Sequence, residues 1–184
     1  MPIAISGSGT ISGVSVGGLP DGIVDTDMIA ANAVATAKIA ANAVTAPKRG
    51  TGAVLQVVTD IDSGQFTTNS SSWQWQGLDV SITPSSASNK VLVIVGLAMH
   101  AGNNQAYMTL YRGTDNLGGA EGFGACQEDG NFRVISNISY LDSPSSTSAV
   151  QYRVAVRNSN NSTTIECPPW ANGKQTITAL EIAG

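Results

Sequence analysis

The sequence contains a single histidine, His100, and this limits the catalytic chemistry open to the chain. A Ser-His-Asp or Cys-His arrangement for nucleophilic catalysis would have to use it. His100 directly follows the apolar stretch 90–99, and at this position a structural role is the simplest interpretation. The alternative is a threefold assembly in which three copies of His100 near the axis hold a metal ion. We expect no catalytic histidine and no metal site.

Two pairs of carboxylates are close enough in sequence to suggest the acid and nucleophile of a glycosidase. Asp25 and Asp27 lie in a repetitive segment, and Glu128 and Asp129 have no identifiable carboxylate partner elsewhere. A solvated turn explains such pairs better. The glycines between 118 and 124 do not form a phosphate loop, because no Lys-Ser or Lys-Thr pair follows them. The sequence therefore predicts no catalytic residue, no cofactor and no enzymatic activity.

Polar loops carry the side chains that are best suited to recognise a cell surface. Asparagine and aspartate offer donors and acceptors for sugar hydroxyls, and an exposed aromatic ring can stack on a sugar face. The long loop 112–130 is the best candidate, with shorter loops around 103–105, 158–162 and 170–172. Packing beneath a loop is the alternative role for the tryptophan at 170. The residues expected to contact a ligand are Trp170, Asn172, Asn103, Asn104, Asp115, Asn116, Glu121 and Phe123.

These loops belong to a segment, residues 54–184, with the pattern of a β-structure. Short apolar or alternating runs are separated by turns rich in Gly, Asn, Ser and Pro, which is typical of an antiparallel sandwich or jelly roll. Trp73 and Trp75 share one face of such a run and are interpreted as core or interface residues. The predicted strands cover residues 54–58, 73–83, 90–99, 107–111, 132–141, 149–157, 163–167 and 175–182.

Three of these runs are apolar on both faces: 91–99, 134–141 and 177–182. In a two-sheet sandwich one face of each sheet should be polar and in contact with water. The excess of apolar faces predicts a subunit interface, most simply in a threefold oligomer.

A ten-residue repeat precedes the β-segment, and residues 23–53 are predicted to form a stalk. Its apolar positions, such as Ile29, Val34 and Ile39, are always five apart. That spacing fits neither one face of a helix, nor one face of a strand, nor a heptad coiled coil. We expect a short helical turn followed by an extended stretch, wound with two other chains. An ordinary alanine-rich helix is the alternative.

Composition sets further limits on function. Charged residues make up 12% of the chain and hydrophobic residues 42%, which indicates a folded protein. The net charge of −4 leaves no basic patch for nucleic acid. No apolar run is long enough to span a membrane, and the start lacks the features of a secretory signal. Cys126 and Cys167 either pair or remain buried thiols.

Several motifs together resemble the fibre proteins of tailed bacteriophages, in particular those of marine and cyanobacterial phages. The motifs are residues 7–11 and 17–24, the decapeptides 29–38 and 39–48, the stretch 78–93 and the closing strand 176–182. The resemblance covers nearly the whole chain. It implies a homotrimer with an N-terminal virion-attachment segment (1–22), a narrow stalk (23–53) and a distal β-sandwich knob (54–184).

The function implied by this resemblance is host recognition: the knob would bind a surface glycan or an outer-membrane component during adsorption. The N-terminus would join a tail, baseplate or capsid protein, and the chain, made in the host cytoplasm, would reside in the virion. Two alternatives remain open. One is a head fibre or capsid decoration protein without a specific receptor, and the other is a polysaccharide depolymerase.

Overall fold

A computed structural model describes residues 34, 38–40, 43–45, 48–127 and 133–184. Residues 46–184 form one compact unit. The predictions for the attachment segment 1–22, for most of the stalk and for Glu128 and Asp129 lie outside the described residues. Within the repeat, the side chains of Val34, Ile39 and Val44 are exposed.

The compact unit contains a four-stranded antiparallel sheet. Its strands are β1 (Val54–Asp62), β11 (Gln175–Ile182), β4 (Lys90–Met99) and β8 (Val134–Asp142), in that spatial order. The sheet therefore brings together strands from both ends and the middle of the unit. The three runs that the sequence shows to be apolar on both faces become neighbours as β11, β4 and β8.

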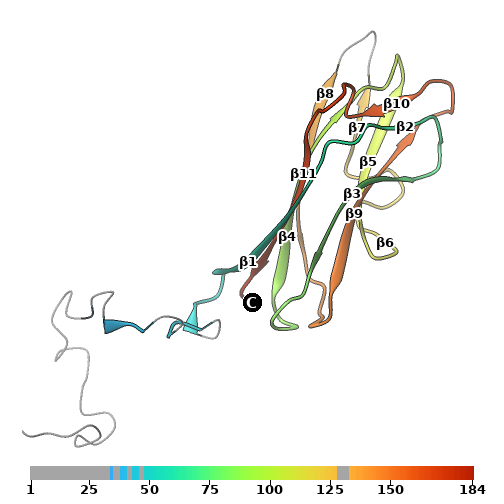
Figure 1. Ribbon diagram of the computed structural model, residues 1–184. Coiled ribbons are helices and arrows are strands. Elements are labelled where there is room, and N and C mark those ends of the chain that lie inside the picture. The colour runs from blue at the N-terminus through green and yellow to red at the C-terminus, as the bar shows by residue number, and fades with distance from the viewer. Residues whose placement is uncertain (1–33, 35–37, 41–42, 46–47, 128–132) are drawn as a thin grey trace, which may run out of the picture. The chain divides into compact units, whose positions relative to one another are not determined.

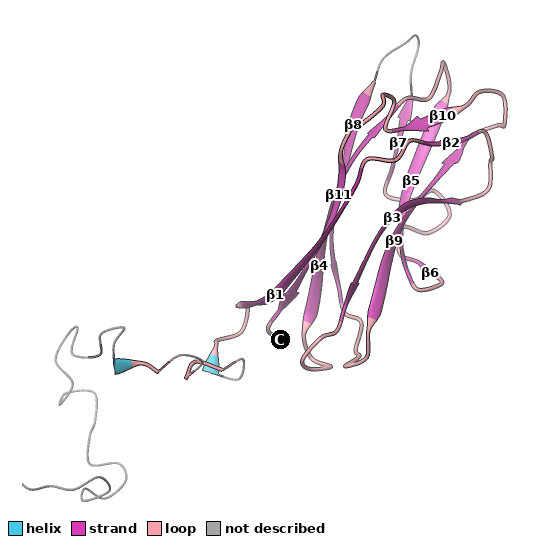
Figure 2. Ribbon diagram, in the orientation of Figure 1, coloured by secondary structure: helices cyan, strands magenta, loops and turns pink. Residues whose placement is uncertain are grey.

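A second sheet faces the first (Figure 1). It is built from β3 (Gln74–Ile82), β9 (Val150–Asn158) and β5 (Gln105–Arg112), with the short strands β6 (Asp115–Asn116) and β7 (Gly124–Gln127) paired to β5. A separate pair joins β2 (Phe66–Thr68) to β10 (Ile165–Cys167). Figure 2 shows that strands and loops make up nearly all of this unit.

The strand order defines the fold as a jelly roll. When β1, β3, β4, β5, β7, β8, β9 and β11 are counted one to eight, the sheets read 1-8-3-6 and 2-7-4-5. Successive strands in this count lie in opposite sheets, except for β5 and β7, which are neighbours in the same sheet. This is the eight-stranded, double Greek-key arrangement of jelly rolls. The prediction of an antiparallel sandwich of jelly-roll type is confirmed.

The core lies between the two sheets and follows from strand alternation. On β4, Val91, Val93 and Val95 point inward and are fully buried, and on β9 Tyr152 and Val154 do the same. Every second residue of an extended strand faces the same side, so these runs deliver one continuous apolar layer from each sheet. The prediction of a strand over 149–157 with alternating inward and outward side chains is thus confirmed.

The chain enters and leaves the sandwich at one end. Gly52 N–H donates to the Ala183 carbonyl at 2.8 Å, and Ala183 N–H donates to the Ala53 carbonyl at 2.9 Å. We call this the near end. The strand registers place residues 63–73, which include β2, and the loops 100–104, 159–164 and 168–174 at the opposite, far end, as Figure 1 also shows.

The prediction of one long loop over 112–130 is wrong in part, because this stretch contains β6 and β7. β7 is a short edge strand whose inward side chain is Cys126, so its alternation is too brief to stand out in the sequence. The outward residues Leu92 and Ile94 show that β4 is buried on one face only; the other face contacts solvent.

Candidate functional site

Four of the eight predicted ligand-binding residues lie at the far end of the sandwich. Asn103 and Asn172 both adopt left-handed backbone conformations, each with a φ of 64°, so they serve as turn residues. The Asn104 amide donates to the side-chain oxygens of Asn158 and Asn160, both at 2.6 Å. Asn104 therefore holds two far-end loops together instead of presenting its amide to a ligand.

Trp170 is the exposed aromatic of the far end. It lies in a tight turn in which Gly173 N–H donates to the Trp170 carbonyl at 3.3 Å. Its side chain is 44% exposed, so the alternative of packing beneath a loop describes it only in part.

Asp115 and Asn116 lie on the edge strand β6, away from the far-end loops. The Asn116 side-chain oxygen accepts from Thr109 Oγ1 at 2.5 Å and from Gly118 N–H at 3.1 Å. Its amide donates to the Gly119 carbonyl at 2.7 Å. Asn116 thus fixes the loop after β6, and Asp115 contacts Arg112 at 3.3 Å.

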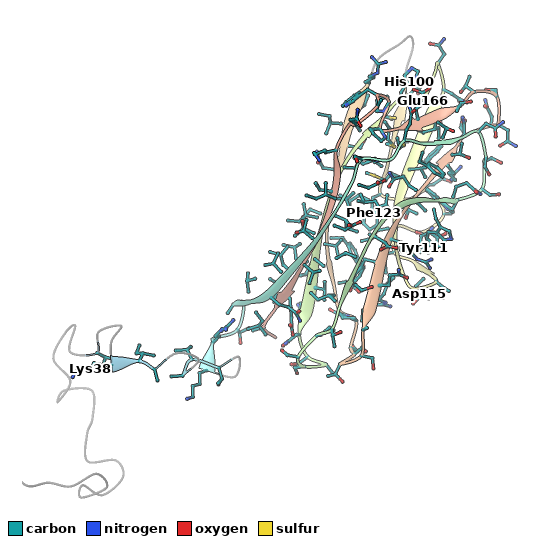
Figure 3. The ribbon with its side chains drawn as sticks, viewed as in Figure 1. Lys38, His100, Tyr111, Asp115, Phe123 and Glu166 are labelled. Atoms are coloured by element: carbon teal, nitrogen blue, oxygen red, sulfur yellow. The ribbon has the colours of Figure 1, made fainter. Side chains whose placement is uncertain are left out.

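Glu121 and Phe123 belong to the loop 117–123, which packs beside β5. Glu121 forms an ion pair of 3.1 Å with Arg157 on β9. Phe123 meets the ring of Tyr140 on β8 edge to face, with centroids 5.1 Å apart, and lines a hollow of about 180 Å³ between the sheets. Figure 3 labels Phe123 and Asp115 at separate places on the unit. The eight predicted residues therefore form no single cluster.

A different group of side chains does gather, on the outer surface of β3, β9 and β5. We call it the aromatic–arginine face, and it consists of Trp73, Trp75, Tyr107, Tyr111, Arg153 and Arg157. The Arg153 guanidinium lies 3.9 Å from the centroid of the Trp75 ring, and Trp75 meets Tyr111 edge to face at 4.6 Å. The Arg157 guanidinium lies 4.0 Å from the Tyr107 centroid and 5.0 Å from that of Trp73. These distances are those of cation–π contacts and aromatic pairs.

Strand register explains why these side chains meet. Asp79 on β3 and Tyr111 on β5 both lie opposite Arg153 on β9, so the three form one row across the sheet. A bulge between Trp75 and Asp79, where Gly77 has a φ of 96°, shifts β3 against β9. Beside this row lies a hollow of about 150 Å³, lined by Trp75, Gly77, Leu78, Asp79, Arg153 and Val154.

The sequence prediction missed this face. The sequence predicts Trp73 and Trp75 in the core or an interface; Trp75 is 45% exposed, so it lies outside the core of the unit. A signal was available: Arg153 and Arg157 alternate with the inward residues of their strand, and Tyr107 and Tyr111 do the same on theirs. No sequence rule tells which strands pair, and so the contact between these alternating sets was not predictable.

The outer surface of the other sheet is apolar. Val57, Leu180, Leu92 and Leu141 lie in register and form a row across all four strands. Ile61, Ile94 and Ile135 extend this surface, and Ile135 is 71% exposed. Thr, Ser, Asn, Gly and Ala fill most of the remaining outward strand positions, and the charged strand residue on this side is Lys90 at the near end. We call this surface the apolar face.

His100 lies at the far end next to Glu166, as Figure 3 shows. The two residues exchange backbone hydrogen bonds of 3.0 Å, and His100 Nδ1 is 3.7 Å from a Glu166 carboxylate oxygen. In the part of the chain that the structure describes, no three His, Cys, Asp or Glu side chains gather as metal ligands. Cys126 and Cys167 are both buried thiols. Burial, with smaller contributions from Cys126 and Glu166, raises the pKa of Cys167.

Comparisons with known proteins identify no family. No protein-family profile matches the chain, and no curated protein matches it. Among solved structures, infectious bursal disease virus of the Gx strain is similar with a TM-score of 0.39 and 14% identity, over 70% of this chain and 32% of that chain. The VP2 subviral particle of the same virus is similar with a TM-score of 0.31 and 16% identity, over 70% and 37% of the two chains.

This chain therefore spans about a third of the length of those two structures. The assignment of the fold comes from the strand order of the chain itself. In the described residues no helix is long and apolar enough to cross a membrane.

Proposed function

We propose that this chain is a virion structural protein, a homotrimeric fibre of a tailed bacteriophage whose jelly-roll unit binds the host cell surface without hydrolysing it. The observation that carries the proposal is the apolar face. A monomeric protein in water rarely exposes a contiguous apolar surface of this kind, and such surfaces mark interaction sites. The second copy of the chain is the occupant that fits it best.

Charge is the first reason to choose a second copy. Apart from Lys90 at its margin, the described strand residues of the apolar face are uncharged, so two copies meet without like-charge repulsion. The second reason is aliphatic character. When a second copy covers Val57, Leu92 and Leu141, each Å² of apolar surface removed from water contributes about 25 cal/mol to the free energy of association. The predicted stalk repeat would hold three chains close together and favour this contact.

The far end of the sandwich supports a role in host contact. The chain enters and leaves at the near end, and so the far-end loops are remote from both. Rigid sheets that present loops at one end are a common way to build a binding surface. Three units in one fibre, and several fibres on one virion, would raise the overall affinity above that of a single site.

The first experiment is the solution mass of the purified chain by light scattering. A mass of three times 18.8 kDa supports the trimer. Ile94→Glu places a charge in the middle of the apolar face and should reduce the mass toward that of a single chain. Ser81→Glu is the matched control, because Ser81 is exposed on the outer side of the opposite sheet. A wild-type monomer at micromolar concentration would overturn the proposal.

A second experiment tests the role in host contact. The purified chain is added to host cells before infection, and phage adsorption is measured. Competition for adsorption supports a receptor-binding fibre. Unchanged adsorption, together with labelling of the N-terminal segment on the capsid, would instead support a head fibre or decoration protein. Release of reducing sugars from host envelope by the chain would point to a depolymerase.

A further inference from the structure

We infer that Trp75 and the side chains around it form a binding site for a neutral sugar ring. We call this group the Trp75 site; it comprises Trp75, Tyr111, Arg153, Asp79 and Gln151. The inference rests on the proposed function, since it names the class of ligand that a host-binding unit would take. It places the ligand on the sheet face instead of on the predicted far-end loops.

The first step is the fixed position of Trp75. Tyr111 forms an edge-to-face pair with it, with centroids 4.6 Å apart, and the Arg153 guanidinium lies 3.9 Å from its centroid. Despite these two contacts the side chain remains 45% exposed. An exposed aromatic ring held in one orientation loses little conformational freedom when a ligand stacks on it, and this favours binding.

The second step is the polar surroundings of the ring. Asp79 is the residue at which the β3 bulge ends, and its Oδ2 accepts from Gln151 Nε2 at 3.1 Å. A carboxylate and an amide side by side supply both acceptors and donors, which suits neighbouring sugar hydroxyls. The hollow of about 150 Å³ between Trp75 and Asp79 gives a single ring room to approach. A small number of polar groups beside an aromatic surface is the common pattern of a ligand site.

The third step concerns the charge of the ligand. Arg153 already donates through Nη2 to the Gly113 carbonyl at 2.6 Å and stacks on Trp75. Asp79 lies opposite Arg153 in the strand register, so the negative charge of one offsets the positive charge of the other. The site therefore has no net charge to select an ionic sugar, and a neutral sugar suits it.

The neighbouring arginine stack provides an internal comparison. Arg157 stacks on Tyr107 in the same manner, but it is paired with Glu121 at 3.1 Å. The loop 117–123 also covers Trp73, since a Cβ added at Gly122 would meet the Trp73 ring at 2.8 Å. The chain therefore closes one aromatic–arginine stack with its own loop and leaves the other open to solvent.

Affinity electrophoresis of the full chain in gels that contain soluble glucan, mannan or galactan tests this inference. We expect at least one neutral polysaccharide to retard the wild-type chain. Trp75→Ala should weaken that retardation about tenfold or more, as expected for a tryptophan at the centre of an interface. Val54→Ala is the matched control, because Val54 is exposed to 47% at the near end of β1, away from the Trp75 site and from the far-end loops, so it should bind like the wild type.

Further variants separate ligand binding from folding. Trp75→Phe keeps a stacking ring and should retain part of the affinity, and Asp79→Asn should weaken binding without loss of the folded structure. Light scattering on each variant reports whether the oligomer is intact. Equal binding by Trp75→Ala and the wild type, or the absence of retardation by all three neutral polysaccharides, would overturn the inference.

Failure of this inference would be distinguishable from failure of the proposed function. A chain that competes for phage adsorption but binds none of the polysaccharides is a host-binding fibre with a different ligand. A chain that binds a polysaccharide through Trp75 but does not compete for adsorption has the sugar site without the host-binding role.

Discussion

Arg112 on β5 and Asp142 on β8 form an ion pair that joins the two sheets, with Arg112 Nη1 3.0 Å from Oδ1 and 3.1 Å from Oδ2. Tyr152 on β9 donates its hydroxyl to the same carboxylate at 2.7 Å. Asp142 is buried, so its negative charge relies on the opposite charge of Arg112 and on the hydrogen bond from Tyr152. The pair therefore ties β8 to the opposite sheet near the end where the chain enters.

Replacement of the Asp142 carboxylate should destabilise the unit strongly. Asp142→Ala leaves the buried Tyr152 hydroxyl without its acceptor and leaves Arg112 with only the exposed Asp115 as an acidic partner, and we expect a loss of about 2–4 kcal/mol in the free energy of unfolding. Asp115→Ala is the control, because Asp115 contacts the same arginine at 3.3 Å with a side chain that is 67% exposed. Asp115→Ala should lower the free energy of unfolding by less than about 1 kcal/mol. Urea unfolding measures both values, and equal losses would contradict this account.

Glu181 should make the stability of the unit depend on pH in the acid range. Burial alone would raise its pKa, but hydrogen bonds from Asn89, Gln56 and Ser85 lower it below the ordinary value of 4.5. A group whose pKa is lower in the folded state than in the unfolded state stabilises the fold at any pH above its unfolded pKa. This stabilisation is lost as the pH falls through the folded-state pKa. The free energy of unfolding should therefore fall as the pH drops below about 4.5.

The variant Glu181→Gln tests this dependence. It removes the titrating group, so it should be less stable than the wild type at neutral pH and should show a flatter profile in acid. Denaturant unfolding at a series of pH values gives the curves; parallel curves for Glu181→Gln and the wild type would speak against the prediction.

Gly122 should tolerate no side chain. Its φ is 74°, and an added Cβ would collide with the Met108 carbonyl and meet Trp73. Gly119 has a similar φ of 68°, but a Cβ there would meet nothing within 4 Å. Gly119→Ala therefore carries only the backbone strain, about 1 kcal/mol, whereas Gly122→Ala should cost roughly 2–4 kcal/mol. Thermal unfolding of the two variants compares them directly.

Neither cysteine should react in the folded chain. The thiolate is the reactive form, and burial raises the pKa of Cys167, so little thiolate is present at neutral pH. Cys126 is also buried. Ellman's reagent should detect almost no thiol in native protein and two per chain in 6 M guanidinium chloride, where both of the two cysteines are accessible. Rapid labelling of the native chain would show that one thiol is more accessible than its burial indicates.

Much of the fold could be predicted from strand patterns. The alternation over 149–157 and the apolar run over 90–99 correspond to β9 and β4 within one residue. The three runs that are apolar on both faces are neighbours in one sheet. What the sequence does not contain is the list of strand partners, because pairing depends on contacts between residues far apart in the chain. The short edge strands β6 and β7 were missed for lack of alternating positions.

The binding residues were harder to predict because polar chemistry alone is ambiguous. Asn104 and Asn116 have the donors and acceptors that a sugar requires, but loop backbone and neighbouring side chains already use them. The sequence predicts Trp75 in the core or an interface because it shares one strand face with Trp73, and its outward position depends on the register of β3 against β9. The sequence therefore predicts which groups could bind, while the fold decides which of them remain available.

The pairing of β1 with β11 also determines how the unit would carry a mechanical load. The chain enters at the start of β1, beside Ala183, and β1 runs from there to the far end. Hydrogen bonds in an antiparallel pair are perpendicular to the strands. A pull on the chain before Ala53, resisted by a ligand on the opposite sheet or at the far end, acts along β1. It would load the whole β1–β11 ladder in shear at once, instead of peeling its bonds apart one by one.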